Sequence, residues 1–359
     1  MPLNNNISIS RLNLVKIFSG WVSVSIQALL KNYLSAMLLL GLGYLFYSRL
    51  PHFRDFFSAT YSFPAFDISG SEILSGVLTL YAIFLIPFYM TFTEDDVPKS
   101  RLFWRAVFKF YRTGLSHREK TAVLAILVKF FFMPLMLVWL FGHLATMFYQ
   151  WSLYMDIQTF FPNGYWLIFQ SILLLDVLFF ALGYMIEHPC LGNEIRSVEP
   201  TLLGWSVALV CYPPFNGMMN EVLGWHSADY PEFQSVMAQY IAGIAMLVFL
   251  AIYAWASLAL NLKASNLTHR GIVNKGPYRW VRHPAYIAKN IAWWIGGIPI
   301  VMFAWQEGIG NTAYIIFGIL GWTFIYYLRA ITEERHLSRD GDYVRYCQSV
   351  RYRFIPGLI

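Results

Sequence analysis

The feature that most constrains the fold of this chain is a series of apolar segments, each long enough to cross a lipid bilayer. Of the 359 residues, 57% are hydrophobic and only 13% are charged, and so many apolar side chains cannot be buried in one soluble core. Several runs reach the roughly 20 residues that a helix needs to span the hydrocarbon layer. Because that layer holds no water to satisfy backbone polar groups, each run is expected to be helical. The sequence therefore predicts an all-α, polytopic transmembrane helix bundle.

We expect about eight spans, preceded by an interfacial helix. Residues 8–30 mix apolar side chains with Arg11 and Lys16, as helices that lie on a membrane surface do. The fifth span is interrupted by Pro213 and Pro214, because proline lacks a backbone donor and fixes φ. The expected spans are 33–47, 73–92, 122–149, 165–186, 201–219, 236–262, 285–304 and 312–330.

The distribution of lysine and arginine predicts the orientation of the spans, since cytoplasmic loops of membrane proteins are enriched in these residues. Segments 149–164 and 221–235 contain neither residue. On the opposite side, seven basic residues lie in 93–120, five in 263–282 and six in 329–353. Eight spans place these basic segments and both termini in the cytoplasm. The net charge of +6 follows largely from this asymmetry, and no soluble basic domain remains that would bind nucleic acid.

One segment between two expected spans, GPYRWVRHPAY at residues 276–286, carries more chemistry than a connector needs. It combines prolines, a glycine, arginines, a histidine and tyrosines. Pro277 and Pro284 prevent one uninterrupted helix. Irregular backbone at a membrane border is tolerated where protein covers it or where it lines a cavity. The segment is therefore predicted to form part of a site.

A second group of polar residues follows the last expected span. Glu333 and Glu334 lie at its cytoplasmic end, and the tail from Gly341 reads GDYVRYCQSVRYRFIP. Adjacent residues of a helix differ by about 100° in direction, so the two carboxylates cannot both face one atom. We expect one of them to hold a ligand and the other to pair with Arg282 or Arg329.

Together, these two blocks resemble the cofactor motif of the isoprenylcysteine carboxyl methyltransferase family of integral membrane enzymes. The first block fits the pattern G-x-Y-x-x-x-R-H-P-x-Y, and the second is the glutamate pair with Leu337 and the tail. The likeness covers roughly the last hundred residues, and the sequence departs from the pattern at Lys289. We accordingly divide the chain into an N-terminal membrane region, 1–260, that shapes a passage for the acceptor, and a methyltransferase-like membrane region, 261–359.

The resemblance implies a methyltransferase that depends on S-adenosylmethionine, bound from the cytoplasmic side between the last spans and the C-terminal tail. Its acceptor would enter from the bilayer and would be a carboxylate, thiol or amine of an isoprenoid or lipid-like molecule. Catalytic roles are expected for Arg282, His283 and Glu334. Cofactor contacts are expected for Tyr278, His283, Pro284, Tyr286, Glu333, Glu334, Tyr343, Tyr346 and Arg353.

The chemistry of a methyl donor suits these residue types. Aromatic rings attract a sulfonium cation by about 0.5–2 kcal/mol each, and carboxylates accept hydrogen bonds from an ammonium group and from ribose hydroxyls. Methyl transfer is an in-line displacement, so positioning supplies most of the catalysis. Such a site needs neither a metal ion nor a nucleophilic side chain, and we expect no metal site.

Three alternatives stay open from the sequence. The ending YCQSVRYRFIP also resembles the tail of membrane sterol reductases, which have a related fold and use NADPH. Phospholipid methyltransferases, which act on amines, are related in fold as well, and a non-catalytic membrane scaffold is the third alternative. Taken singly, arginine and tyrosine at a helix end are usually membrane anchors, and only the joint occurrence of the two blocks favours a site. Membrane lipids and a lipophilic or lipidated substrate are the expected partners.

Ionisable residues in or beside a span are a further clue. A charge inside the membrane costs at least ~2.5 kcal/mol and usually has a role or a partner. Asp176 lies within the fourth expected span, and Glu187 and His188 follow at its cytoplasmic end. We expect capping and paired charges at this end rather than a metal site.

The predicted orientation determines which loops can be modified from outside the cell. Single cysteines in 149–164 and 221–235, for example Glu232→Cys, should react with a membrane-impermeant maleimide on intact cells, in a variant without the three native cysteines. As the control, Asn274→Cys should react only after the membrane has been permeabilised. Reaction of residue 274 in intact cells would contradict the predicted topology.

Overall fold

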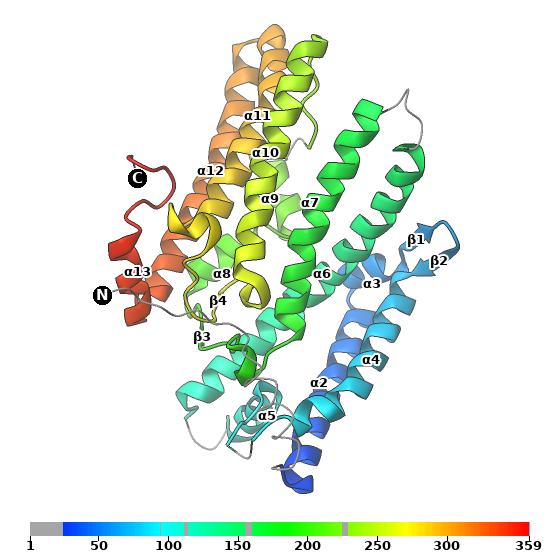
Figure 1. Cartoon of the computed structure of the whole chain (residues 1–359), viewed down its shortest axis with the longest axis vertical. Helices are drawn as coiled ribbons and strands as arrows, with labels where there is room; N and C mark the ends of the chain where they lie inside the picture. Colours follow the sequence, from blue (N-terminus) through cyan, green and yellow to red (C-terminus); the bar gives the residue numbers. More distant parts are fainter. Residues whose placement is uncertain (1–23, 94, 111–113, 155–159, 225–228, 359) are drawn as a thin grey trace. The chain divides into compact units, whose positions relative to one another are not determined.

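The computed structural model describes residues 24–93, 95–110, 114–154, 160–224 and 229–358. Seven helices in this described part are long and apolar enough to cross a membrane. They are α2 (Ile26–Arg49), α4 (Gly70–Met90), α6 (His117–Tyr154), α7 (Phe160–Met185), α10 (Val236–Leu260), α11 (Pro284–Glu307) and α12 (Ile309–Leu337). The prediction of an all-α, polytopic membrane protein is confirmed (Figure 1).

Short elements connect these long helices. The shorter α-helices are α3 (Pro51–Ser58), α5 (Lys99–Lys109), α8 (Leu202–Leu209), α9 (Phe215–Leu223) and α13 (Gly341–Ser349). Single 3-10 turns are η3 (Pro189–Leu191), η4 (Asn261–Lys263) and η5 (Gly276–Arg279). The strands are β1 (Thr60–Phe63), β2 (Phe66–Ser69), β3 (Ser197–Val198) and β4 (Thr268–His269). β1 pairs with β2, and β3 pairs antiparallel with β4 in a register that places Ser197 opposite His269.

Two helix boundaries differ from the prediction in ways that matter. Residues 26–30, predicted as the end of the interfacial helix, are the start of α2, because the Ser25 side chain caps that helix and accepts a hydrogen bond from the Ala28 N–H at 3.3 Å. Residues 8–23 of the predicted interfacial helix lie outside the described residues. α12 continues to Leu337, well past its predicted end at residue 330, so both glutamates of the second block are helical.

The fifth span, predicted at 201–219 with a break at Pro213 and Pro214, is interrupted there in the structure. The structure has two short helices, α8 and α9, on either side of Pro213 and Pro214. The two prolines lack backbone N–H groups, and their fixed φ interrupts the helical hydrogen-bond pattern. Neither short helix is long enough to span a bilayer by itself, which needs roughly 20 residues.

The chain nevertheless crosses back along α8 and α9, because α7 and α10 run parallel. The Tyr165 hydroxyl, in the second turn of α7, contacts Met246 Sδ in the middle of α10 at 3.5 Å. Further along both helices, Asp176 Oδ2 of α7 accepts a hydrogen bond from the Tyr253 hydroxyl of α10 at 2.6 Å. Two parallel helices require a return segment between them. That return is the broken crossing through α8 and α9.

The chain divides into two compact units. The first consists of Met1–Ser62, Phe66–Pro134 and Glu187–Glu194, and the second of Phe63–Ala65, Leu135–Ile186 and Ile195–Ile359. The long helix α6 contributes to both units. All ten predicted site residues belong to the second unit. The functional division at residue 260 stays a prediction.

Polar contacts tie together the helices of the first unit. Glu187 pairs with Lys99 at 3.1 Å and with Lys129 at 2.8 Å. His188 Nε2 lies 2.8 Å from Thr91 Oγ1. His188 Nδ1 accepts a hydrogen bond from the Cys190 N–H at 3.1 Å. Both residues are therefore engaged in charge pairing and capping, as the sequence predicted.

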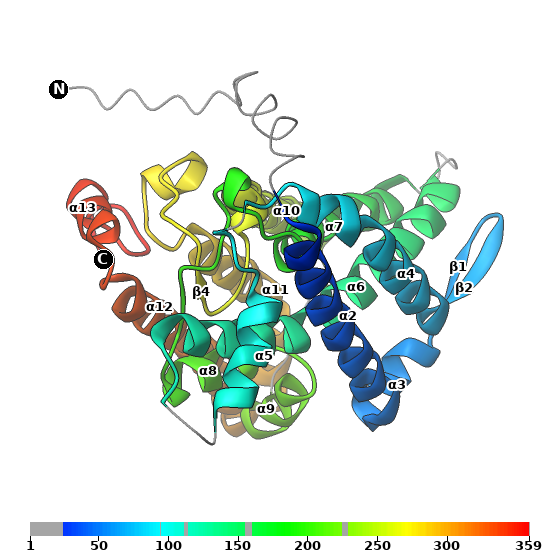
Figure 2. The same cartoon turned by 90° about the horizontal axis from the view of Figure 1, so that it is seen from below.

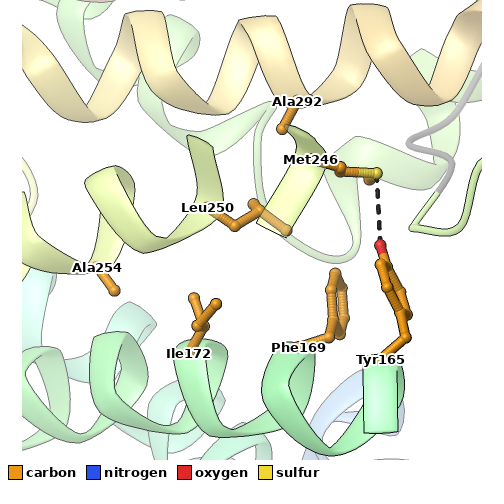
Figure 3. Close-up of a cluster of buried hydrophobic side chains, with 7 residues drawn as sticks. All are labelled: Tyr165, Phe169, Ile172, Met246, Leu250, Ala254 and Ala292. Atoms are coloured by element: carbon orange, nitrogen blue, oxygen red, sulfur yellow. Dashed lines mark hydrogen bonds between the residues drawn. The ribbon is translucent and has the colours of Figure 1, made fainter. Parts of the chain in front are cut away.

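The core of the second unit lies where α7, α10 and α11 meet (Figure 3). Its buried side chains are Tyr165, Phe169 and Ile172 from α7, Met246, Leu250 and Ala254 from α10, and Ala292 from α11. Small residues on α10 and α11 let those helices approach closely, while the aromatic rings of α7 fill the remaining space. Lipid tails are as apolar as the helices, so the hydrophobic effect does not drive membrane helices together. Their association depends on close packing of this kind.

The last two long helices form an antiparallel hairpin that presents the candidate site. The turn is made at Gly308, whose φ of 130° is a conformation that side chains rarely allow. Ile319 and Trp322 of α12 are buried against α9 and α11. Gly297 of α11 leaves room for Ile319, since a Cβ there would lie 2.8 Å from its Cδ1. At the far end of α12 the chain turns into α13 (Figure 2).

A close backbone approach at Gly183 generates a test of this packing. A Cβ at Gly183 of α7 would lie 2.1 Å from the Ala264 carbonyl oxygen, a backbone atom that cannot rotate away. Gly183→Ala should therefore lower the apparent melting temperature in detergent, with a loss of about 1–3 kcal/mol or more. The control is Gly217→Ala in α9, where a Cβ would meet nothing within 4 Å. It should be neutral or slightly stabilising, and equal losses in both variants would contradict the close contact.

Candidate functional site

The two sequence blocks meet at one end of the α11–α12 hairpin. The first block forms η5 and the start of α11, where His283 is the N-cap residue and Pro284 the first helical residue. The second block lies in the last turns of α12 and in α13. Because α11 and α12 are antiparallel, His283 and Glu334 come into contact although 51 positions separate them in the sequence.

Glu334 joins the two blocks. Its Oε1 accepts a hydrogen bond from His283 Nε2 at 3.0 Å and lies 3.3 Å from Arg282 Nε. Its Oε2 accepts a hydrogen bond from an Arg353 amino group at 2.7 Å. Since a carboxylate can only accept, Nε2 of His283 carries the proton. Glu334 is only 8% exposed, so one buried anion holds together the loop, α12 and the tail.

The C-terminal tail is also fixed by its backbone. The N–H groups of Arg282 and His283 donate to the carbonyl oxygens of Tyr352 and Arg353 at 3.0 and 2.9 Å. In α13, the Tyr346 hydroxyl donates to the Tyr278 carbonyl oxygen at 2.8 Å. The hydrogen bond to Glu334 raises the pKa of the Arg353 guanidinium, which stays charged. The tail therefore covers the first block through directional bonds.

Glu333, the neighbouring carboxylate, faces a different direction and belongs to an aromatic group. The Tyr286 hydroxyl donates a hydrogen bond to Glu333 Oε2 at 2.8 Å. The His283 ring stacks on the Tyr286 ring, with centroids 5.3 Å apart and planes 9° apart. The Arg329 guanidinium lies 5.1 Å from the ring centroids of both Tyr286 and Tyr326. Glu334 pairs with Arg282, as expected for one of the two glutamates, and Glu333 Oε2 also lies 3.8 Å from His283 Nδ1. That the other glutamate holds a ligand stays a prediction.

These residues border a cavity of about 120 Å³ in the second unit. Its walls carry both charges and aromatic rings. The charged or ionisable lining residues are Glu199, Arg282, His283, Lys289, Arg329, Glu333 and His336, and the tyrosines are Tyr212, Tyr253, Tyr278, Tyr286 and Tyr326. Burial, with a further contribution from Glu333, raises the pKa of Tyr278 well above its usual range, so its hydroxyl stays neutral. The cavity therefore presents fixed charges of both signs together with aromatic faces.

The predicted site residues fall into two groups. Those that line the cavity are Tyr278, Arg282, His283, Tyr286 and Glu333. Those that lie behind its wall are Pro284, Glu334, Tyr343, Tyr346 and Arg353. Pro284 is the first residue of α11, and Arg353 binds Glu334. Tyr343 and Tyr346 belong to the small core under α13. Direct ligand contacts for this group stay a prediction.

Sequence reasoning missed Glu199, which lies between β3 and α8. Its Oε1 accepts hydrogen bonds from the Thr201 N–H at 3.0 Å and from Arg335 at 2.9 Å. Its buried Oε2 has no hydrogen-bond partner among the residues that the structure describes. Gly204 makes this position feasible, because a Cβ there would lie 2.7 Å from the Glu199 Cδ. No motif marks Glu199, since its place in the cavity depends on the pairing of β3 with β4.

A second cavity of about 290 Å³ lies in the second unit among α6, α7, α10, α11 and α12. Five residues line both cavities: Phe180, Tyr212, Tyr253, Lys289 and Tyr326. Most other lining residues are apolar or aromatic, including Met136, Trp139, Leu173, Val177, Leu250 and Trp293. The two cavities therefore share a wall of aromatic side chains and one lysine.

The contacts of Glu334 generate a prediction about stability. Glu334→Gln removes the charge shared by Arg282, His283 and Arg353 while it keeps the size of the side chain. Loss of buried charge-assisted hydrogen bonds should lower the unfolding free energy by about 1.5–3 kcal/mol, measured as a shift in denaturant or thermal unfolding in detergent. The neighbouring Glu333 has a side chain that is 45% exposed, and Glu333→Gln should cost under about 0.5 kcal/mol. Equal stability of the two variants would refute the role assigned to Glu334.

Comparison with known families agrees with the two blocks. Residues 236–339, from the start of α10 to just beyond α12, match the model of the isoprenylcysteine carboxyl methyltransferase (ICMT) family. Neither the curated proteins nor the solved structures gave a match. Both the first block and the glutamate pair fall within the matched range, together with the hairpin that connects them. Residues 236–339 are thus similar to the isoprenylcysteine carboxyl methyltransferase family.

Proposed function

We propose that this protein is an integral membrane methyltransferase that transfers a methyl group from S-adenosylmethionine to a lipophilic acceptor held in the membrane. The observation that carries the proposal is the convergence of both sequence blocks on one cavity, most of whose lining residues belong to the ICMT-matching region. Apolar helices on either side of that cavity supply the membrane setting. The acceptor would be a carboxylate, thiol or amine of an isoprenoid or lipid-like molecule.

The cavity lining fits a methyl donor of this kind. The faces of Tyr278, Tyr286 and Tyr326 suit a sulfonium cation, which aromatic rings attract by about 0.5–2 kcal/mol each. Glu333, and the Oε2 atom of Glu199 that lacks a hydrogen-bond partner, suit an ammonium group or ribose hydroxyls. Glu199 and Glu333 both line the cavity. The ammonium group and the ribose hydroxyls of a bound donor would therefore meet hydrogen-bond acceptors.

The protein's contribution to the reaction is positional. S-adenosylmethionine would supply an activated methyl group on sulfur. The acceptor atom would bond to the methyl carbon while the carbon–sulfur bond breaks and leaves its electron pair on sulfur. The cavity walls would hold the acceptor atom, the methyl carbon and the sulfur in line. Two reactants held in this way react faster, because the entropy cost of bringing them together has been met on binding. Arg282, His283 and Glu334 keep the loop, α12 and the tail in fixed positions. The tail over the first block also limits the access of water.

The second cavity is our candidate for the acceptor. It is bordered by membrane-spanning helices and by Tyr212 beside the break at Pro213 and Pro214. Its shared wall with the first cavity would bring an acceptor group next to the donor. The distribution of basic residues supports an arrangement in which the donor cavity faces the cytoplasm and both termini lie on that side.

Ligand binding tests the proposal directly. Calorimetry on purified protein in detergent should show micromolar binding of S-adenosylmethionine and of its demethylated product, S-adenosylhomocysteine, and no binding of NADPH. Glu333→Gln should weaken both nucleosides about tenfold or more, because it removes a charged hydrogen-bond acceptor from the wall. Arg351→Gln, on an exposed tail residue outside the cavity lining, is the control and should bind as the wild type does.

Two outcomes would replace the proposal. Tight binding of NADPH without binding of the methyl donor would indicate a reductase of the sterol reductase type. If the folded protein bound none of S-adenosylmethionine, S-adenosylhomocysteine and NADPH, the result would indicate a non-catalytic membrane protein.

A further inference from the structure

Glu199 is a buried carboxylate that uses only one of its two oxygens. The residue is 2% exposed and lines the cavity of about 120 Å³. Its Oε1 accepts a hydrogen bond from the Thr201 N–H at 3.0 Å and forms an ion pair with Arg335 at 2.9 Å. Within the described part of the chain, no donor reaches the buried Oε2. An ionised carboxylate accepts up to about four hydrogen bonds, so Glu199 keeps unused acceptor capacity at the cavity.

The other two glutamates that the described chain buries to this extent use both of their oxygens. Glu334 binds a histidine through Oε1 and an arginine through Oε2. Glu119 binds a lysine through Oε1 and a serine through Oε2. A buried acceptor without a donor is costly, and such groups are rare in folded proteins. The exception at Glu199 therefore points to a donor that a ligand brings.

The backbone around Glu199 fixes its position. Its N–H donates to the Leu267 carbonyl oxygen at 2.8 Å, and its own carbonyl oxygen accepts from the Trp205 indole N–H at 2.8 Å. Gly204 leaves the space that the side chain occupies, because a Cβ at this glycine would overlap the carboxyl group. A group held in this way needs little further ordering when a ligand binds, which favours affinity.

A buried cation lies beside the segment that holds Glu199. Leu267 binds the backbone of Glu199, and the neighbouring Asn266 accepts a hydrogen bond from the Arg329 guanidinium at 2.9 Å. Arg329 lines the same cavity and forms no ion pair with any residue that the structure describes. Consecutive residues of one segment thus position an anion and a cation in the cavity wall. A ligand that carries an ammonium and a carboxylate on one carbon, as an amino acid does, would match both charges.

We propose that Glu199 binds the ammonium group at the amino-acid end of S-adenosylmethionine, so that a residue outside the matched range 236–339 takes part in binding the donor. The inference rests on the proposed function, because it places that donor in this cavity. Glu333 is less suited to the ammonium group. Its Oε2 already accepts from the Tyr286 hydroxyl at 2.8 Å, and its side chain is 45% exposed. One of the three N–H donors of an ammonium group would satisfy the buried Oε2 of Glu199.

A pair of ligands that differ only in the amino group tests this contact. S-adenosylhomocysteine has a neutral thioether in place of the sulfonium, so the ammonium group is its cation near neutral pH. The comparison ligand is 5′-S-(3-carboxypropyl)-5′-thioadenosine, which lacks the amino group and is otherwise the same. Calorimetry on the wild-type protein in detergent should show that the deaminated ligand binds at least about tenfold more weakly, as expected for the loss of a charge-assisted hydrogen bond.

Three variants locate the source of that preference. Glu199→Gln keeps an oxygen for Thr201 and Arg335 but removes the charge. It should weaken S-adenosylhomocysteine about tenfold and leave the deaminated ligand nearly unchanged, so that the ratio of the two affinities approaches one. Glu194→Gln, at an exposed glutamate outside both cavities, is the matched control and should keep the wild-type ratio. Glu333→Gln should weaken both ligands and also keep the ratio.

The proposal is overturned by equal affinity of the wild type for the two ligands, or by an unchanged ratio in Glu199→Gln. An unchanged ratio would mean that the carboxylate binds a ribose hydroxyl or water, or serves only Arg335. Should Glu199→Gln fail to fold, Glu199→Asp keeps the charge, withdraws the carboxylate by one methylene and should reduce the ratio. If S-adenosylhomocysteine itself does not bind, the proposed function fails as well, whereas binding without a preference for the amino group rejects the role of Glu199 alone.

Discussion

The arrangement of the candidate site depends on one buried carboxylate. Glu334 of α12 accepts from a histidine at the start of α11 and from an arginine of the tail, and it pairs with a second arginine before α11. These groups come from three segments that local structure alone would leave apart. Because removal of one partner from a buried ionic cluster leaves uncompensated charge, the cluster specifies one arrangement. The cavity beside it, with Glu333 and the stacked rings of His283 and Tyr286, follows from that arrangement.

Much of this could be predicted from the sequence because it is encoded locally. Apolar runs of bilayer length identify the spans, and prolines identify the break at Pro213 and Pro214. The two blocks identify the ends of the last hairpin. The helical angle between adjacent residues predicts that Glu333 and Glu334 do not face one atom, and they approach different nitrogens of His283. The family match over residues 236–339 confirms the resemblance on which the methyltransferase interpretation was based.

The remaining features depend on contacts between distant segments, which no local pattern encodes. Glu199 reaches the cavity beside Glu333 only because β3 pairs with β4 and because Gly204 leaves room for its carboxylate. Asp176 was predicted to need a partner, but its partners, Tyr253 and Ser257, follow from the parallel packing of α7 on α10.

The shared wall of the two cavities has a thermodynamic consequence. Phe180, Tyr212, Tyr253, Lys289 and Tyr326 contact the space on both sides, so a ligand that orders these side chains in one cavity changes the surface offered to the other. Such an effect is a coupling free energy, and it is reciprocal. Whatever factor the first ligand applies to the affinity of the second, the second applies to the first, whichever of them binds earlier.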